Sequence, residues 1–167
     1  MATRRSERTQ GDLEVIVKAK QMAVHTVRIT NNTNYFPKRF RLTITDKITN
    51  KAFEIFTLLY ETNEIFPRTK TEFEERQRKQ RKAMACCRTL TAMIDIAEEL
   101  FHLPGDKVRY WAQLVVEIRY ATAAWYKAEL QTFGKRFADI AEAKQEIFIT
   151  ELELAFLGML KEIKMQA

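Results

Sequence analysis

One spacing in the chain resembles a metal-binding pattern. Glu99 and His102 follow the Glu-x-x-His order that places two ligands on one face of a helix in di-iron bundles. Such a site needs a second copy of the pattern and two further inward glutamates, and the only other histidine, His25, has no glutamate three residues before it. We therefore attribute the pattern to chance and expect no metal and no other cofactor.

The two cysteines, Cys86 and Cys87, are adjacent in the sequence. Neighbouring side chains on a helix point about 100° apart, so this pair is not expected to form an ordinary structural disulfide. Neither thiol has the glycine-rich elbow of a nucleophile, and we interpret both as small buried hydrophobic residues. The chain also has no phosphate-cradling glycine loop. These residues predict a protein that is not an enzyme.

A dense run of cations between residues 76 and 88 is the strongest local anomaly. For half of them a glutamate stands four residues earlier, the order that favours ion pairs on a solvated helix face. Arg81, Lys82 and Arg88 have no acid at that position. A phosphate-binding ridge and a solvated, self-paired face both remain open. The candidate nucleic-acid or partner-binding residues of this run are Arg76, Arg78, Lys79, Arg81, Lys82 and Arg88.

A second basic group follows a proline. The segment Pro37-Lys38-Arg39-Phe40-Arg41 places three cations beside aromatic side chains. The aromatic rings could close the end of a bundle while the cations stay in water, or the cations could bind phosphates or an acidic protein surface. The candidate residues here are Lys38, Arg39 and Arg41.

Aromatic residues crowd the last third of the chain. Trp111 and Trp125 fall on the apolar stripe of a predicted helix and are expected in the core. Four other residues lie off this stripe and are of types enriched at protein interfaces, with nucleobase stacking as the alternative. These interface candidates are Tyr110, Arg119, Tyr120 and Tyr126.

The composition restricts the fold that can hold these residues. The chain has 167 residues, 46% of them hydrophobic, which suits one domain with a real core. Only 4 Gly and 3 Pro are available for turns, which favours long helices over a sheet. The net charge of +6 favours an anionic partner, although proteins that bind nothing acidic also reach it. The chain shows neither a secretory signal nor an apolar run of membrane-spanning length, so we expect a cytoplasmic protein.

Helical periodicity and breakers predict an all-α, up-down-up-down four-helix bundle. The first helix should begin near Asp12 as its N-cap, and the segment that follows it, around Pro37, should be non-helical. The expected parts are a basic tail over 1–11, helices over about 12–31, 43–65, 69–103 and 106–133, and a helical extension over 134–167.

Two of these parts predict contacts beyond the bundle. The first helix is apolar around most of its circumference, so we expect a neighbouring subunit to cover part of it. The extension carries an apolar stripe that includes Phe137 and Phe148 but no net basic charge. We expect it to be a docking helix for protein contacts rather than for RNA.

The order of these features resembles a known four-helix-bundle family. The resemblance rests on Phe36-Pro37-Lys38 with its basic-aromatic continuation between two helices, on the basic third helix and on the late Trp125. It covers about residues 12–130. This family includes the proteins encoded within intervening sequences of bacterial large ribosomal RNA and the accessory variability determinants of diversity-generating retroelements. Where a Gly-Gly pair often precedes the late tryptophan, this chain has Ala123 and Ala124.

The resemblance implies a bacterial or phage-encoded accessory protein that assembles into a ring or barrel, with a pentamer as the expected assembly. It implies binding to a reverse transcriptase and to its template RNA or an RNA/DNA hybrid, in support of mutagenic cDNA synthesis. Lys38, Arg39 and Arg41 match the basic loop of the family. The alternative is a helical adaptor or oligomerisation protein with no specific nucleic-acid role.

Overall fold

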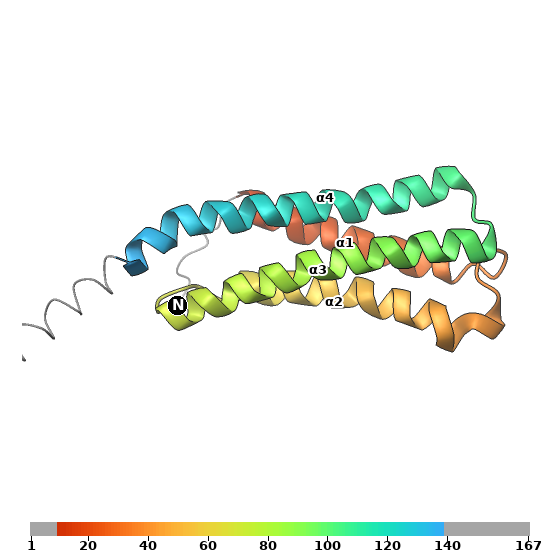
Figure 1. The fold of residues 1–167 in the computed structure, drawn as a ribbon, viewed down its shortest axis with the longest axis horizontal. Coiled ribbons are helices and arrows are strands. Elements are labelled where there is room, and N and C mark those ends of the chain that lie inside the picture. The colour runs from red at the N-terminus through yellow and green to blue at the C-terminus, as the bar shows by residue number, and fades with distance from the viewer. Residues whose placement is uncertain (1–9, 139–167) are drawn as a thin grey trace, which may run out of the picture. The chain divides into compact units, whose positions relative to one another are not determined.

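The computed structural model describes residues 10–138, with side chains from Glu14 onward. The described part contains helices and no strand, which confirms the predicted all-α class (Figure 1). Most of the predicted basic tail and residues 139–167 of the predicted extension lie outside the described residues. The four α-helices are α1 (Gln10–Thr30), α2 (Asp46–Glu64), α3 (Lys70–Phe101) and α4 (Gly105–Glu129).

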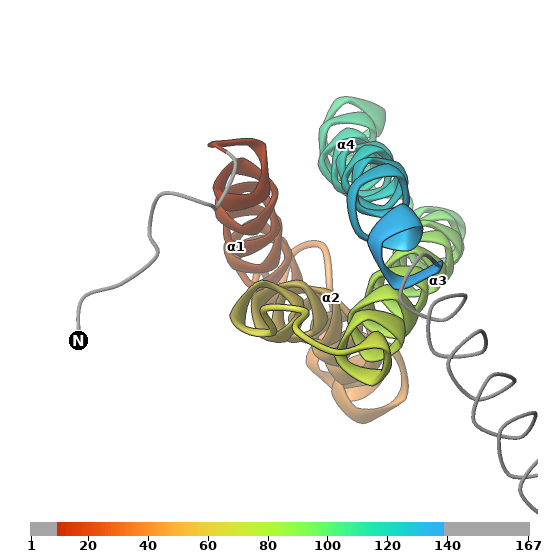
Figure 2. The ribbon, with the colours of Figure 1, turned by 90° about the vertical axis from the view of Figure 1, so that its left-hand side faces the viewer.

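The four helices pack side by side (Figure 2), and the colours of Figure 1 show that their directions alternate. Near the end of α1, the Thr26 hydroxyl accepts a hydrogen bond of 2.9 Å from the indole N–H of Trp111, near the start of α4. At the opposite end of α4, the ring of Trp125 lies 5.0 Å below the guanidinium of Arg76 of α3. These two contacts place α4 antiparallel to both of its neighbours.

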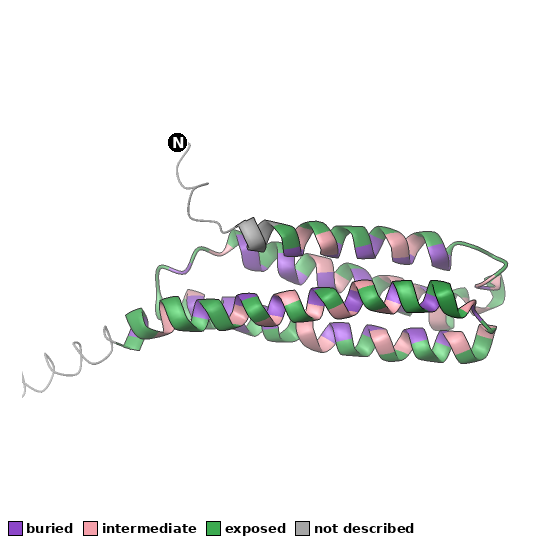
Figure 3. Ribbon diagram, turned by 90° about the horizontal axis from the view of Figure 1, so that it is seen from above, coloured by how far each residue is buried: buried purple, intermediate pink, exposed green. Residues whose placement is uncertain are grey.

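The core lies where the helical periodicity predicts it. The inward stripes of α2, α3 and α4 are buried along the length of the bundle (Figure 3). Both tryptophans are buried, Trp111 completely, as their spacing predicts. Burying a side chain of the size of Ile55 or Leu90 stabilises the fold by about 1.5–3 kcal/mol. The stripes therefore supply most of the force that holds the four helices together.

Two of the predicted boundaries are wrong. Helix α1 begins at Gln10, so Asp12 lies inside its first turn and is not the N-cap. The segment after Pro37 is helical: a 3₁₀ turn over Lys38–Phe40 and a π-helical turn over Arg41–Thr45 lead directly into α2. Pro37 has a φ angle of −59° and no backbone N–H to leave unpaired, so it begins a helical segment as readily as it ends one.

Helices α3 and α4 begin and end close to the predicted positions. Thr69 and Glu72 form a capping box at the start of α3, in which Glu72 N–H donates to the Thr69 hydroxyl and Thr69 N–H donates to the Glu72 carboxylate. His102 ends α3 in the left-handed conformation, with a φ angle of 52°, just before Pro104. Local sequence signals therefore set both ends of α3.

The chain divides into two compact units between Ala128 and Glu129, slightly before the boundary expected near Gly134. In the second unit, the described residues form a π-helical turn over Leu130–Gly134 and a helical stretch over 135–138. The rings of Phe133 and Phe137 stack within it, 6.5 Å apart. None of the described helices has the combination of length and apolarity that a bilayer crossing requires.

Candidate nucleic-acid interface

Arg76, the first cation of the basic run, is buried and serves the fold. Its side chain is 7% exposed, and its guanidinium donates a hydrogen bond of 2.7 Å to the carbonyl of Thr62 and a further one to the carbonyl of Ile65. Thr62 lies in the last turn of α2 and Ile65 follows its last residue, and the carbonyls at this end of a helix lack donors within the helix. The expectation that Arg76 is a surface cation is therefore wrong, because its guanidinium is hydrogen-bonded to the carbonyls at the end of α2 and packs on the face of Trp125.

Two lysines of the same run form ion pairs with α2. The amine of Lys79 lies 2.6 Å from the Glu61 carboxylate, and the amine of Lys82 lies 3.0 Å from that of Glu54. Glu54 also accepts a hydrogen bond from Lys51, and the bonds from Lys51 and then Lys82 lower the pKa of its carboxyl to about 2. Lys82 has no acid four residues before it on α3, and its partner lies on the neighbouring helix α2.

Three arginines remain on the exposed side of α3. Arg78 lies 3.9 Å from Glu75, a weak pair on the surface. Arg81 and Arg88 are exposed and have no ion pair within the described part of the chain. Residues seven apart share a helix face, so these two cations follow each other along about 10 Å of the axis.

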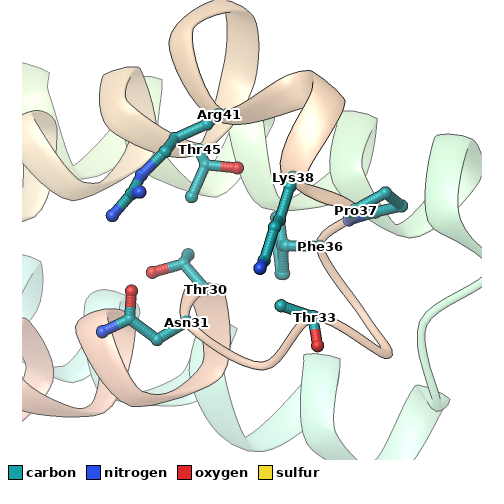
Figure 4. A pocket seen from close by; sticks show the side chains of 8 residues that line it. All are labelled: Thr30, Asn31, Thr33, Phe36, Pro37, Lys38, Arg41 and Thr45. Atoms are coloured by element: carbon teal, nitrogen blue, oxygen red, sulfur yellow. The ribbon is translucent and has the colours of Figure 1, made fainter.

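The basic loop cations lie at the other end of α2 and point in different directions. Lys38 and Arg41 border a cavity of about 160 Å³ between the end of α1 and the start of the α2 segment (Figure 4). Arg39, between them in sequence, lies over the ring of Phe40 at 4.8 Å from its centroid. The rings of Phe36 and Phe40 in turn contact Phe101, with centroids 5.1 and 5.2 Å apart, so the aromatic residues close the bundle end as one of the two interpretations expects.

The interface candidates on α4 divide into exposed and half-buried residues. Tyr110 and Tyr120 are 54% and 62% exposed. Arg119 is half-buried and its guanidinium lies 4.9 Å from the Tyr120 ring centroid, while Tyr126 is also half-buried. Of these four candidates, the structure therefore leaves the two tyrosines more than half exposed and available for contacts.

The side chain of His25 has surroundings that the sequence did not indicate. Its ring is half-buried and meets Tyr110 edge-on at 5.0 Å and Trp111 at 6.5 Å. Its Nε2 atom is buried and has no hydrogen-bond partner among the described residues. Burial, followed by the nearby charges of Arg28 and Lys107, lowers the pKa of this imidazole. Only the packing of α4 on α1 brings these groups to His25.

Replacement of His25 by glutamine should make stability less dependent on pH. The folded state holds the pKa of His25 below its ordinary value of 6.5, so the unfolded state takes up the proton first as the pH falls. The contribution of neutral His25 is therefore complete above pH 6.5 and is lost between that value and the lower folded pKa. We expect melting temperatures measured from pH 7.5 to pH 5 to fall for the parent and to fall less for His25→Gln.

The matched control for this prediction is His102→Gln, which changes the only other histidine, an exposed one. It should keep the slope of the parent protein. Equal slopes for the parent and for His25→Gln would mean that another group causes the pH dependence.

The two cysteines and the Glu99–His102 pair are the groups whose possible chemistry the sequence raised. Burial raises the pKa of the Cys86 thiol and raises that of the Cys87 thiol to about 12, so both are protonated at neutral pH and neither is a ready nucleophile. Glu99 and His102 are both exposed. Among the described residues, no group of three or more potential ligands could hold a metal ion.

Comparison of the chain with protein-family models, with curated proteins and with solved structures gives no match. The family resemblance therefore rests on the residues quoted for it, and the function is argued from the surface described above.

Proposed function

We propose that this chain is a non-catalytic, RNA-binding accessory protein that works with a reverse transcriptase in a diversity-generating retroelement. The single observation that carries RNA binding is the exposure of Arg81 and Arg88 on one face of α3 without ion pairs in the described part of the chain. Arg76 is buried, and Lys79 and Lys82 pair with glutamates of α2, so Arg81 and Arg88 are the cations of the run that have no ion pair in the described part of the chain and stay available for phosphates.

The partner and assembly parts of the proposal rest on other surfaces. Tyrosine is enriched at protein interfaces, and Tyr110 and Tyr120 are both more than half exposed on α4. On α1, Val17 and Val24 are also exposed, which supports a neighbouring subunit over this helix. Assembly into a pentamer and contact with a reverse transcriptase come from the family resemblance. A reverse transcriptase gene beside the gene for this chain would support both.

A specific observation also favours the alternative, a helical adaptor without a nucleic-acid role. One buried arginine and two lysines paired with α2 reduce the unpaired part of the basic run below what the sequence predicts, and Arg78 has its own glutamate nearby. Surface arginines of this kind also serve solubility. RNA binding and its salt dependence distinguish the two functions.

Replacement of both Arg81 and Arg88 by serine should weaken binding of structured RNA by about tenfold or more, because two charge-assisted phosphate contacts are lost. The slope of log K against log salt concentration should become shallower by about one for each contact. Melting temperature should stay close to that of the parent, since exposed substitutions usually change stability by about 0.5 kcal/mol or less. Gel-shift titrations at several salt concentrations measure the first two quantities.

The control variant is Lys20→Ser with Lys47→Ser, which lowers the net charge equally at exposed positions on α1 and α2. It should bind RNA nearly as the parent does. An equal loss in both variants would reduce the effect to net charge, and no loss in either would favour the adaptor.

A further inference from the structure

We propose that the cavity between the end of α1 and the start of the α2 segment binds a terminal phosphate of an RNA strand. The inference rests on the proposed function, since RNA is the source of the phosphate, but it concerns a site at the opposite end of α2 from the buried Arg76. Thr30 and Asn31 at the end of α1, Thr33 and Phe36 in the connection, and Lys38 and Arg41 of the following turns line this cavity.

The charge of the cavity fits a dianion. Its lining contains two cations and no acidic side chain. Lys38 and Arg41 form no ion pair within the described residues, and Figure 4 shows both side chains extending from the start of the α2 segment toward the end of α1 and the connection after it. A terminal phosphate carries about −1.5 to −2 charges at neutral pH. A phosphodiester within a strand carries only one, so two unpaired cations suit the terminal group better.

The donors and the size of the cavity also fit a phosphoryl group. Beside the two cations, Thr33 and Asn31 supply an exposed hydroxyl and an exposed amide that can donate to phosphate oxygens. The buried ring of Phe36, at the cavity wall, is held by Phe101 and Trp111 at centroid distances of 5.1 and 6.3 Å. A volume of about 160 Å³ has room for a phosphoryl group.

The loop also explains why Arg39 is not part of this site. Arg39 lies between the two lining cations in sequence, but its guanidinium packs on the Phe40 ring. In a 3₁₀ turn such as Lys38–Phe40, side chains three residues apart lie on the same side, so Lys38 and Arg41 share one side and Arg39 does not. This difference provides a matched control within one turn of the chain.

The test compares short single-stranded RNAs of one sequence with a 5′-phosphate, with a 3′-phosphate and without either. We expect the parent to bind at least one phosphorylated RNA about tenfold more tightly than the unphosphorylated one, as charge-assisted hydrogen bonds allow. The variant Lys38→Met with Arg41→Gln should bind all three RNAs equally. Arg39→Gln, which removes the neighbouring cation, should keep the preference. Inorganic phosphate should abolish the preference of the parent.

Equal binding of all three RNAs by the parent would overturn the inference. If inorganic phosphate then still raises the melting temperature of the parent but not that of Lys38→Met with Arg41→Gln, the cavity takes free phosphate and the RNA assignment is wrong. If the double variant is instead less stable without any phosphate effect, the two cations serve only the negative end of α1. The variant Arg81→Ser with Arg88→Ser separates this result from the proposed function. If this variant loses overall RNA affinity while the parent shows no preference for a terminal phosphate, the proposed RNA-binding function stands and only the phosphate site is wrong.

Discussion

Replacement of Trp111 by alanine should lower the free energy of unfolding by about 3–5 kcal/mol, the usual cost of removing a buried aromatic side chain. Trp111 is completely buried and contacts the Phe36 ring at a centroid distance of 6.3 Å. Its indole N–H also donates to the Thr26 hydroxyl, which itself donates to the carbonyl of Met22. The substitution therefore creates a cavity and removes the polar contact that joins α1 to α4. Denaturant titration followed by circular dichroism measures the change.

Tyr120→Ala provides the control on the same helix. This tyrosine is 62% exposed, so its loss should change the free energy of unfolding by about 0.5 kcal/mol or less. A Trp111→Ala protein that unfolds at the same denaturant concentration as Tyr120→Ala would mean that α4 does not pack on α1 as described.

Replacement of Arg76 by methionine should destabilise the protein by about 2–4 kcal/mol, although it leaves the apolar part of the side chain in place. The guanidinium donates to the carbonyls of Thr62 and Ile65 and lies over the Trp125 ring. Methionine can make neither hydrogen bond, and a buried acceptor that loses a charged donor costs free energy. Hydrogen exchange should also become faster at the end of α2, where these carbonyls lie.

The control for this prediction is Arg78→Met, two residues further along α3. Arg78 is exposed and has only a pair at 3.9 Å with Glu75, so its loss should cost about 0.5 kcal/mol or less. Similar costs at both positions would contradict the structural role of Arg76. A loss of RNA binding at Arg76 without a loss of stability would return this arginine to the candidate binding residues.

Much of the fold could be predicted because its signals are local. Apolar residues recur with helical spacing, as at Ile48, Ala52 and Ile55, and such positions must turn toward a common core wherever the neighbouring helices lie. Pro67 and Pro104 interrupt the pattern, and the number and order of the helices follow from these breaks. The start of the α2 segment could not be predicted in this way, because Pro37 is compatible with both a loop and the first turn of a helix.

The candidate site depended far more on tertiary structure. The sequence by itself determined that the chain is helical and basic, and that its cations concentrate after Pro37 and along residues 76–88. Only the packing of α2 against α3 decided which of these cations stay available, because Glu54 and Glu61 meet Lys82 and Lys79 across the helix interface. Helical periodicity predicts only which residues three or four positions apart are neighbours. The two ion pairs join residues that are 28 and 18 positions apart in the chain. For the same reason, spacing placed Arg76 among the surface cations, and the end of a second helix, which only folding brings to it, made it a buried donor.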